Sequence, residues 1–195
     1  MSVDGKLYAA MELLARMVLL NLIFLLFAPF FVTTGVLISG MMYIYDDPNR
    51  PIKACFGFMY RNFIKSLPLT IFFMASLSTS YYLIMGARGE AVQVITSAVA
   101  AALLIGYNLM MFYLFAKYDM PIRRYFQSGF YLLLQNILVI LLLVFAGAVI
   151  TFLVLTQSAA LFIMFAVSID LYLFVRMNKT KVQRLYALST GAAQD

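Results

Sequence analysis

Long uncharged stretches dominate the pattern of hydrophobic and polar positions along the 195-residue chain. Four gaps between consecutive charged residues are long enough to cross a membrane: 17–45, 66–87, 91–116 and 125–169. An α-helix rises 1.5 Å per residue, so about 20 residues span the hydrocarbon layer. The first three gaps therefore hold one helix each. The fourth gap is about twice as long as one span and holds two helices. Its most polar triplet, Thr156-Gln157-Ser158, is the expected turn between them.

This pattern predicts an all-α fold, a polytopic transmembrane helix bundle that forms one integral membrane domain over residues 1–195. The spans are expected at 18–44, 66–87, 91–116, 127–154 and 159–176, between a short N-terminal segment (1–16) and a basic cytoplasmic tail (177–195). The first apolar stretch is too long for the hydrophobic region of a cleaved signal peptide, and no small-residue cleavage site follows it. We therefore expect that stretch to remain in the mature protein.

Composition supports a membrane location and argues against several function classes. The chain is 65% hydrophobic and 11% charged, whereas soluble domains carry about 25% charged residues. A net charge of +6 in so apolar a chain favours a membrane surface as partner and not nucleic acid. With no His and one Cys, the chain lacks the residues for a His/Cys metal site, a Ser-His-Asp triad or a disulfide. We expect no enzymatic activity and no cofactor.

The distribution of basic residues predicts the orientation of the five spans. One side of the membrane receives eleven Lys and Arg residues, and the other receives three, at positions 6, 16 and 88. The side with eleven is expected to be cytoplasmic, which places the N-terminus outside and the C-terminus inside. If the first apolar stretch forms a re-entrant pair, the N-terminus moves to the cytoplasmic side.

Residues 51–65, between the first two spans, have the pattern of a short amphipathic helix lying in the membrane surface. Pro51 suits the first position of a helix. Apolar residues then share one face (Ile52, Phe56, Met59, Phe63), and basic residues occupy the opposite half (Arg50, Lys53, Arg61, Lys65). We expect this cytoplasmic helix to contact lipid or a partner protein through Lys53, Phe56, Met59, Arg61, Phe63 and Lys65. Charge that simply fixes the topology is the alternative.

A break is expected in the first apolar stretch. Pro29 removes one backbone donor and crowds the carbonyl one turn earlier. Backbone groups freed in lipid must be satisfied within the protein, and Thr33 or Thr34 can do this. We expect the helix to bend or unwind between Pro29 and Gly35.

Asp170 is the only acidic residue within a predicted span and lies six residues before Arg176. Acids inside a membrane often mark an ion or proton site. A depth of about 9 Å also lets the carboxylate reach interfacial water or a basic residue of a neighbouring helix. A structural ion pair is the favoured interpretation, and a transport site is the alternative. The serine-rich segment 76–80 fits hydrogen bonds between helices better than a polar path.

Residues 21–35, with Pro-x-x-x-Thr-x-Gly at 29–35, resemble the N-terminal signature of the YesL-like family of bacterial membrane proteins. Two later parts, 61–65 (Arg-Asn-Phe-Ile-Lys) and the aromatic-rich 112–136, are similar to that family in the same order. The chain departs from the family at Phe24, where Trp is common. The resemblance implies a bacterial integral membrane protein without an established activity. Gene neighbourhood associates members of the family with carbohydrate ABC importers and glycan-degrading enzymes.

Two classes of function follow. The first is a non-catalytic accessory or regulatory subunit associated with a bacterial carbohydrate ABC importer in the cytoplasmic membrane, bound to importer subunits through its spans and residues 51–65. The second is a small autonomous transporter or channel that works as an oligomer and uses Asp170 and the serine-rich span. The sequence contains no nucleotide-binding motif, so any ATP-driven role requires another protein.

Overall fold

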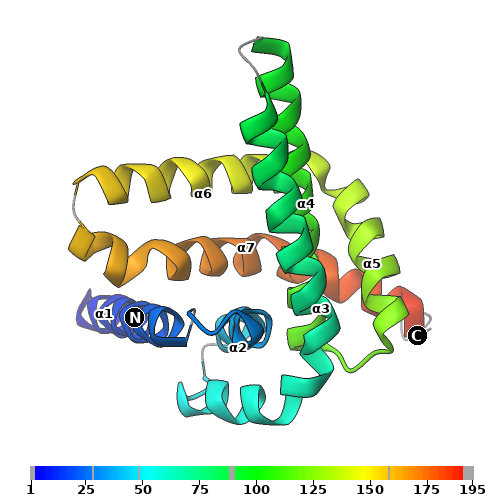
Figure 1. The fold of residues 1–195 in the computed structure, drawn as a ribbon. Helices are drawn as coiled ribbons and strands as arrows, with labels where there is room; N and C mark the ends of the chain where they lie inside the picture. Colours follow the sequence, from blue (N-terminus) through cyan, green and yellow to red (C-terminus); the bar gives the residue numbers. More distant parts are fainter. Residues whose placement is uncertain (1–2, 28, 48, 88–90, 158, 191–195) are drawn as a thin grey trace.

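The computed structural model describes residues 3–27, 29–47, 49–87, 91–157 and 159–190 (Figure 1). Of residues 3–6, 150–155, 157, 159–166 and 187–190 only the backbone is described. The described residues form an all-helical fold without strands, which confirms the all-α part of the predicted fold class. The helices are α1 (Val3–Phe27), the short 3₁₀ helix η1 (Phe31–Thr33), α2 (Thr34–Asp46), α3 (Lys53–Gly86), α4 (Ala91–Lys117), α5 (Ile122–Gln135), α6 (Ile137–Gln157) and α7 (Ala159–Thr190).

The helix break expected at Pro29 is present. Helix α1 ends at Phe27, η1 follows, and α2 begins at Thr34. The Thr33 hydroxyl donates hydrogen bonds to the carbonyl oxygens of Phe27, at 2.9 Å, and Phe30, at 2.7 Å. These two carbonyls also accept the backbone N–H groups of Phe30 and Thr33, so the Thr33 hydroxyl adds to the hydrogen bonding at the break.

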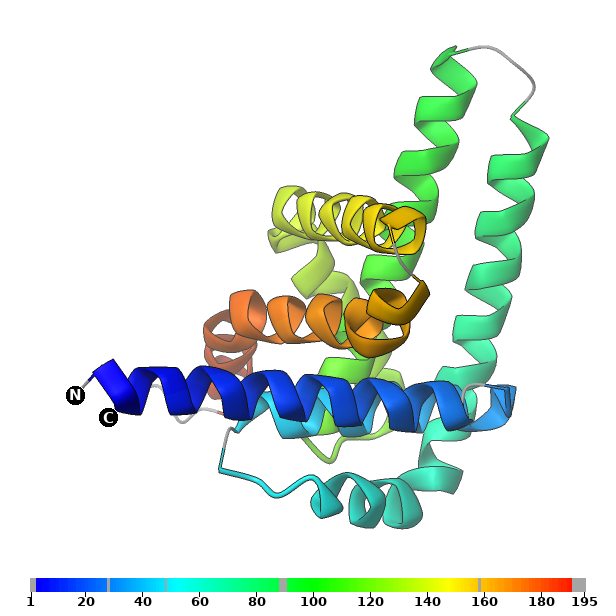
Figure 2. The same cartoon turned by 90° about the vertical axis from the view of Figure 1, so that its left-hand side faces the viewer.

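After this break the chain reverses direction, and α2 runs back along α1 (Figure 2). The Arg16 guanidinium donates a hydrogen bond of 3.2 Å to the backbone carbonyl of Arg50. Ala9 and Glu12 of α1 share the wall of a pocket of about 360 Å³ with Tyr45, near the end of α2. One helix over 18–44 would place these residues at opposite ends of a span, so the prediction of one helix is wrong. The described residues between Phe27 and Thr34 form 3₁₀ hydrogen bonds in place of α-helical ones, which allows the reversal.

Helix α3 joins two elements that the sequence analysis separated. The segment 51–65 and the span 66–87 belong to one helix, which changes direction along its length (Figure 1). Pro68 lies within α3 and cannot donate to the carbonyl of Ile64, so a bend in the preceding turn is expected. The Ser66 hydroxyl donates to the carbonyl of Phe63 at 2.7 Å, in the turn that precedes Pro68. The lower part of α3 therefore lies crosswise to its upper part.

The predicted span 127–154 is also divided. Helices α5 and α6 meet at an angle of 90° around Asn136. The backbone and side-chain nitrogens of Asn136 both donate to the carbonyl of Leu132, at 3.1 and 2.9 Å. The side-chain amide therefore adds a second donor to a carbonyl that already accepts a helical hydrogen bond at the corner. Helix α6 then ends at Gln157, within the predicted turn 156–158, and α7 begins at Ala159.

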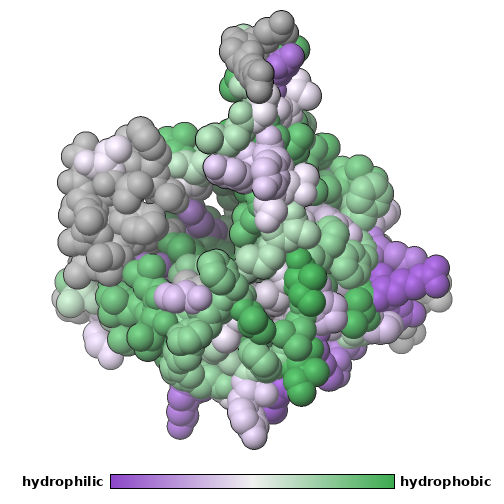
Figure 3. Space-filling model, viewed as in Figure 1, coloured by the Kyte–Doolittle hydropathy of each residue, from purple (hydrophilic) through white to green (hydrophobic). Residues whose placement is uncertain are grey.

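Among the described residues, three helices are long and apolar enough to cross a membrane: Leu7–Phe27, α3 and α4. The bent pair α5 and α6 makes a fourth if it counts as one span. The predicted span 159–176 begins in a stretch whose side chains lie outside the described residues. Apolar side chains cover much of the face shown in Figure 3, which is compatible with a membrane-embedded protein. The expected number of five spans is not confirmed.

Helix α2 lies at the centre of the fold, in contact with α1, α3, α4 and α7. All its residues except Tyr43 are buried. A Cβ atom at Gly35 would overlap the Thr70 hydroxyl, and one at Gly40 would lie 2.9 Å from the Cys55 sulfur. These two glycines therefore allow close approach of α2 and α3. Large, fully buried side chains of α4 pack nearby: Met110, Met111, Phe112, Tyr113 and Leu114.

The predicted basic tail 177–195 is helical as far as Thr190, because α7 continues to that residue. Asn178 and Val182 are buried on one side of it. The Tyr186 ring stacks on Tyr118, with centroids 3.7 Å apart and planes 8° apart. Burial raises the pKa of Tyr118 to about 12, and the negative charge of Asp46 adds to this effect. Within its described part, the tail is thus a packed helix; residues 191–195 lie outside the described residues.

Candidate functional site

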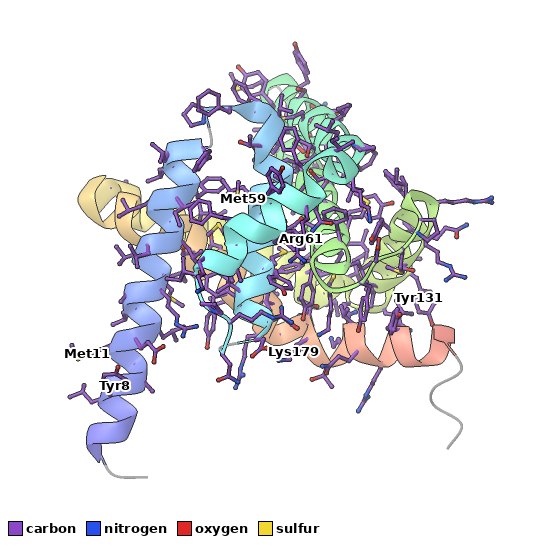
Figure 4. The ribbon with its side chains drawn as sticks, turned by 90° about the horizontal axis from the view of Figure 1, so that it is seen from below. Tyr8, Met11, Met59, Arg61, Tyr131 and Lys179 are labelled. Atoms are coloured by element: carbon purple, nitrogen blue, oxygen red, sulfur yellow. The ribbon has the colours of Figure 1, made fainter. Side chains whose placement is uncertain are left out.

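The lower segment of α3 presents an exposed surface of aromatic and basic side chains, here called the α3 surface. Its exposed members include those predicted for partner or lipid contact, together with two apolar residues that the prediction omitted. They are Lys53, Phe56, Tyr60, Arg61, Phe63, Ile64 and Lys65. Met59 is half-buried beside them, and Figure 4 shows it near Arg61 on this segment. Tyr60 is 89% exposed and Ile64 is 79% exposed.

The face of this segment that packs on the protein differs from the predicted apolar face. Cys55 and Phe58 are the buried side chains, and Phe58 stacks on Tyr43 with centroids 5.1 Å apart. The predicted face included Phe56 and Phe63, which are both exposed. The helix carries apolar residues around most of its circumference, so hydrophobic spacing alone could not select the packed face.

One cation of the α3 surface is tied to the protein. Lys65 forms an ion pair of 3.1 Å with Asp119, in the connection between α4 and α5. Both side chains are largely exposed, so this pair contributes little to stability. Arg61 donates only to the carbonyl of Gly57, one turn earlier on its own helix, at 3.2 Å. Its guanidinium therefore keeps donors for an acidic or phosphate partner.

A buried charged centre joins α2, α4 and α7. The Asp46 carboxylate accepts hydrogen bonds from the Tyr113 hydroxyl, at 2.6 Å, and the Lys117 ammonium, at 2.8 Å. The ammonium of Lys179 donates to the Asp46 backbone carbonyl at 2.5 Å. Figure 4 shows Lys179 on α7 beside this end of α2. Three helices that are distant in sequence thus meet at one acidic residue.

Electrostatics explain why Asp46 stays charged there. Burial alone would raise its pKa, but hydrogen bonds from Lys117 and Tyr113 and the charges of Lys117 and Lys179 outweigh burial and hold the pKa below its usual value. Asp46 ends α2, where the helix dipole disfavours a negative charge. The two lysines offset the carboxylate and the dipole together. The Asp46 centre therefore holds α2, α4 and α7 together.

The sequence analysis did not single out residues 46 and 47 and missed this centre. Asp47 is a turn residue, because its side chain accepts a hydrogen bond from the backbone N–H of Asn49 at 3.0 Å. The adjacent Arg50 lies 3.8 Å from the Tyr43 ring centroid and donates to the Tyr43 carbonyl at 2.6 Å. The available signal was an Asp at the end of an apolar stretch, because a carboxylate that becomes buried requires a cation.

Asp170 lies in the wall of an apolar pocket of about 250 Å³ between α4, α6 and α7. The other lining residues are Ile105, Leu109, Leu143, Val144, Gly147, Ala148 and Phe174. A Cβ atom at Gly147 would stand 3.2 Å from the carboxylate carbon and from both carboxylate oxygens. Gly147 therefore makes room for the carboxylate between the two helices. The predicted intramembrane polar residue thus borders a cavity.

The described part of the chain contains no candidate metal site. No group of three or more His, Cys, Asp or Glu side chains there could hold a metal ion.

Comparison of the chain with protein families, with characterised proteins and with solved structures finds no match. The resemblance to the YesL-like family therefore stays a prediction from the quoted motifs.

Proposed function

We propose that this protein is a non-catalytic membrane subunit that assists or regulates a bacterial carbohydrate ABC importer. The observation that carries the proposal is the α3 surface, where exposed Phe56 and Tyr60 adjoin exposed Arg61. Aromatic and Arg side chains provide much of the energy at protein interfaces. The other side of the same segment packs on the fold through Phe58, so the surface is held in place for a partner.

The class of partner comes from the sequence. The motifs at 21–35 and 61–65 resemble the YesL-like family, whose members are associated with carbohydrate importers. The segment 61–65 is itself part of the α3 surface. An accessory role also fits a chain without a nucleotide-binding motif, since an ABC importer supplies its own ATPase subunits.

The proposed location is the bacterial cytoplasmic membrane, with α3 and α4 crossing it. Arg16 lies against Arg50, so the N-terminal helix and the basic loop after α2 share one side. Only Arg88, between α3 and α4, is then left on the opposite side, against thirteen other Lys and Arg residues. This asymmetry supports a cytoplasmic position for both chain ends. The N-terminus would lie inside, and not outside as the five-span arrangement implied.

A second candidate is the small autonomous transporter or channel, working as an oligomer. The Asp170 pocket favours it, because a carboxylate at the wall of an apolar cavity is an arrangement that membrane transporters use for cations. The pocket lies between helices of a single chain. A solute path would require this cavity to open to both sides.

Purification from native membranes tests the first proposal. We expect importer subunits to co-purify with the wild-type protein. Phe56→Ala with Phe63→Ala should reduce co-purification by at least about tenfold, because aromatic anchors of this kind contribute about 2 kcal/mol each at interfaces. Tyr82→Ala is the matched control, since Tyr82 is 73% exposed on the upper part of the same helix. Solute uptake into liposomes by the purified chain alone would contradict the accessory role and support the transporter.

A further inference from the structure

A polar groove separates the end of α5 from the last turns of α7. It has a volume of about 410 Å³, and its walls are Tyr131, Gln135, Asn136, Lys181, Arg184 and Leu185. Figure 4 shows Tyr131 on α5 facing the C-terminal part of α7. None of its lining residues belongs to the α3 surface or lines the Asp170 pocket. Its chemistry is therefore a separate matter from partner binding.

The groove suits an anion. Lys181 and Arg184 lie three residues apart on α7 and thus on neighbouring turns of one face. Neither forms an ion pair within the described part of the chain, and the six lining residues include no acid. Gln135 donates to the Tyr131 hydroxyl at 2.7 Å. That hydroxyl accepts this bond, so its own proton can be donated into the groove.

The surroundings of the groove are apolar. Four exposed side chains of α6 recur at intervals of four, three and four residues and so form one stripe: Leu138, Leu142, Phe145 and Val149. The stripe begins two residues after Asn136, on the helix that follows the groove. A surface that hydrocarbon would cover therefore lies on the next element of the chain. A free inorganic anion would need no such stripe, whereas a phospholipid presents both chemistries in one molecule.

We propose that this groove binds the phosphodiester headgroup of an anionic phospholipid, with Lys181, Arg184 and Tyr131 as donors. Basic pockets between helices near the cytoplasmic surface are suited to such headgroups. Phosphate oxygens accept from the guanidinium in a bidentate manner and from the ammonium as a point charge. Acyl chains lie along α6. The inference depends on membrane embedding but not on the importer, so either proposal can fail without the other.

The test compares lipid binding by the full chain and two paired variants in a neutral detergent. Dioctanoyl phosphatidylglycerol and dioctanoyl phosphatidylcholine are titrated, and bound lipid is counted by native mass spectrometry. We expect the wild type to prefer phosphatidylglycerol to phosphatidylcholine. The paired variant Lys181→Gln with Arg184→Gln should bind phosphatidylglycerol at least about tenfold more weakly. Arg123→Gln with Arg124→Gln is the control. It removes two cations from α5 that do not line the groove, and it should bind as the wild type does.

Each of the following results would overturn the proposal. Equal loss in the groove variant and the control would show attraction to general surface charge. If inorganic phosphate binds and displaces phosphatidylglycerol, the groove is a site for free phosphate. An unchanged preference in the groove variant would show that the lipid lies elsewhere. If the paired groove variant does not fold, Tyr131→Phe supplies the same test, because it removes one donor and keeps the ring; unchanged lipid binding there overturns the proposal.

Discussion

The guanidinium of Arg16 donates a hydrogen bond to the backbone carbonyl of Arg50, 34 residues further along the chain. The same guanidinium forms an ion pair of 2.6 Å with Glu12. Arg16 thus holds the first helix against the loop that follows α2. Two basic residues that a single first span would separate by the thickness of a membrane are in contact. The α1–α2 hairpin therefore determines on which side the N-terminus lies.

Cysteine labelling in intact cells tests this arrangement. In a Cys55→Ser background, Ser2→Cys and Asn49→Cys should react with a membrane-impermeant maleimide only after the cells are opened. Arg88→Cys, in the connection between α3 and α4, should react in intact cells and serves as the external control. If Ser2→Cys reacts in intact cells while Asn49→Cys does not, the chain crosses the membrane between them and the hairpin is contradicted.

Close contact between α2 and α3 at Gly35 gives a second prediction. The Cβ of Gly35→Ala would overlap the Thr70 hydroxyl and stand 3.1 Å from the Phe112 ring. Overpacking of this kind costs about 1–3 kcal/mol, so thermal unfolding in detergent should occur at a lower temperature. Gly57→Ala is the control, because nothing lies within 4 Å of its new methyl group. Alanine at this helical position should instead stabilise by about 0.5–1 kcal/mol.

The double variant Gly35→Ala with Thr70→Ala separates overlap from other effects. Removing the threonine hydroxyl should recover much of the lost stability, since the methyl group then has space. If Gly35→Ala alone is as stable as the wild type, the helices can move apart and the close contact is not required.

Much of the fold could be predicted from local sequence. The helical class and the break near Pro29 follow from charge-free stretches and from the chemistry of proline, which act within one or two turns. The reversal of α2 and the corner at Asn136 could not, because they depend on contacts between distant segments. An uncharged stretch of 29 residues, such as the first, is compatible with one span or with a hairpin. Contacts between distant residues, such as that of Arg16 with Arg50, distinguish these two arrangements.

The candidate site was predictable to a similar extent. Phe56 and Arg61 were expected to contact lipid or a partner from opposite faces of an amphipathic helix. Both side chains are exposed, and the contact itself stays a prediction. The Asp46 centre was missed because its partners lie 67 to 133 residues away in sequence. Spacing rules relate residues within one helix, whereas an ion pair between helices depends on how those helices are placed.

Asp46 should be important for stability. Asp46→Asn keeps the size of the side chain but leaves the Lys117 ammonium largely buried without its counter-charge. Breaking a buried pair in this way costs about 3 kcal/mol, measurable as a lower midpoint of denaturant unfolding. Adding Lys117→Gln should recover part of that loss. Asp119→Asn is the control: its pair with Lys65 is exposed and should contribute less than about 1 kcal/mol. Equal effects of the two aspartate variants would contradict a special role of the centre.

The lowered pKa of Asp46 predicts how stability depends on pH. A carboxyl whose pKa is lower in the folded state binds a proton more readily when the chain unfolds. Its stabilising contribution is therefore present above the ordinary carboxyl pKa of about 4 and is lost as the pH falls through the lower folded value. Wild-type unfolding midpoints should fall as the pH is lowered from about 5 to 3. Asp46→Asn should show a smaller decrease over this range, and an equal decrease would assign the effect to other carboxyls.

Asp170 decides between the two proposed functions. If the protein is an accessory subunit, Asp170→Asn, which keeps the shape and removes the charge, should leave co-purification and importer-dependent uptake within about twofold of wild type. Gly147→Ala should cost about 1 kcal/mol of stability, because its methyl group would press on the Asp170 carboxylate. Uptake should then follow only the amount of folded protein. Gly86→Ala, in open space, controls for the helix substitution itself. If Asp170→Asn abolishes uptake while folding and assembly stay intact, the carboxylate charge takes part in transport, and the autonomous transporter replaces the accessory subunit.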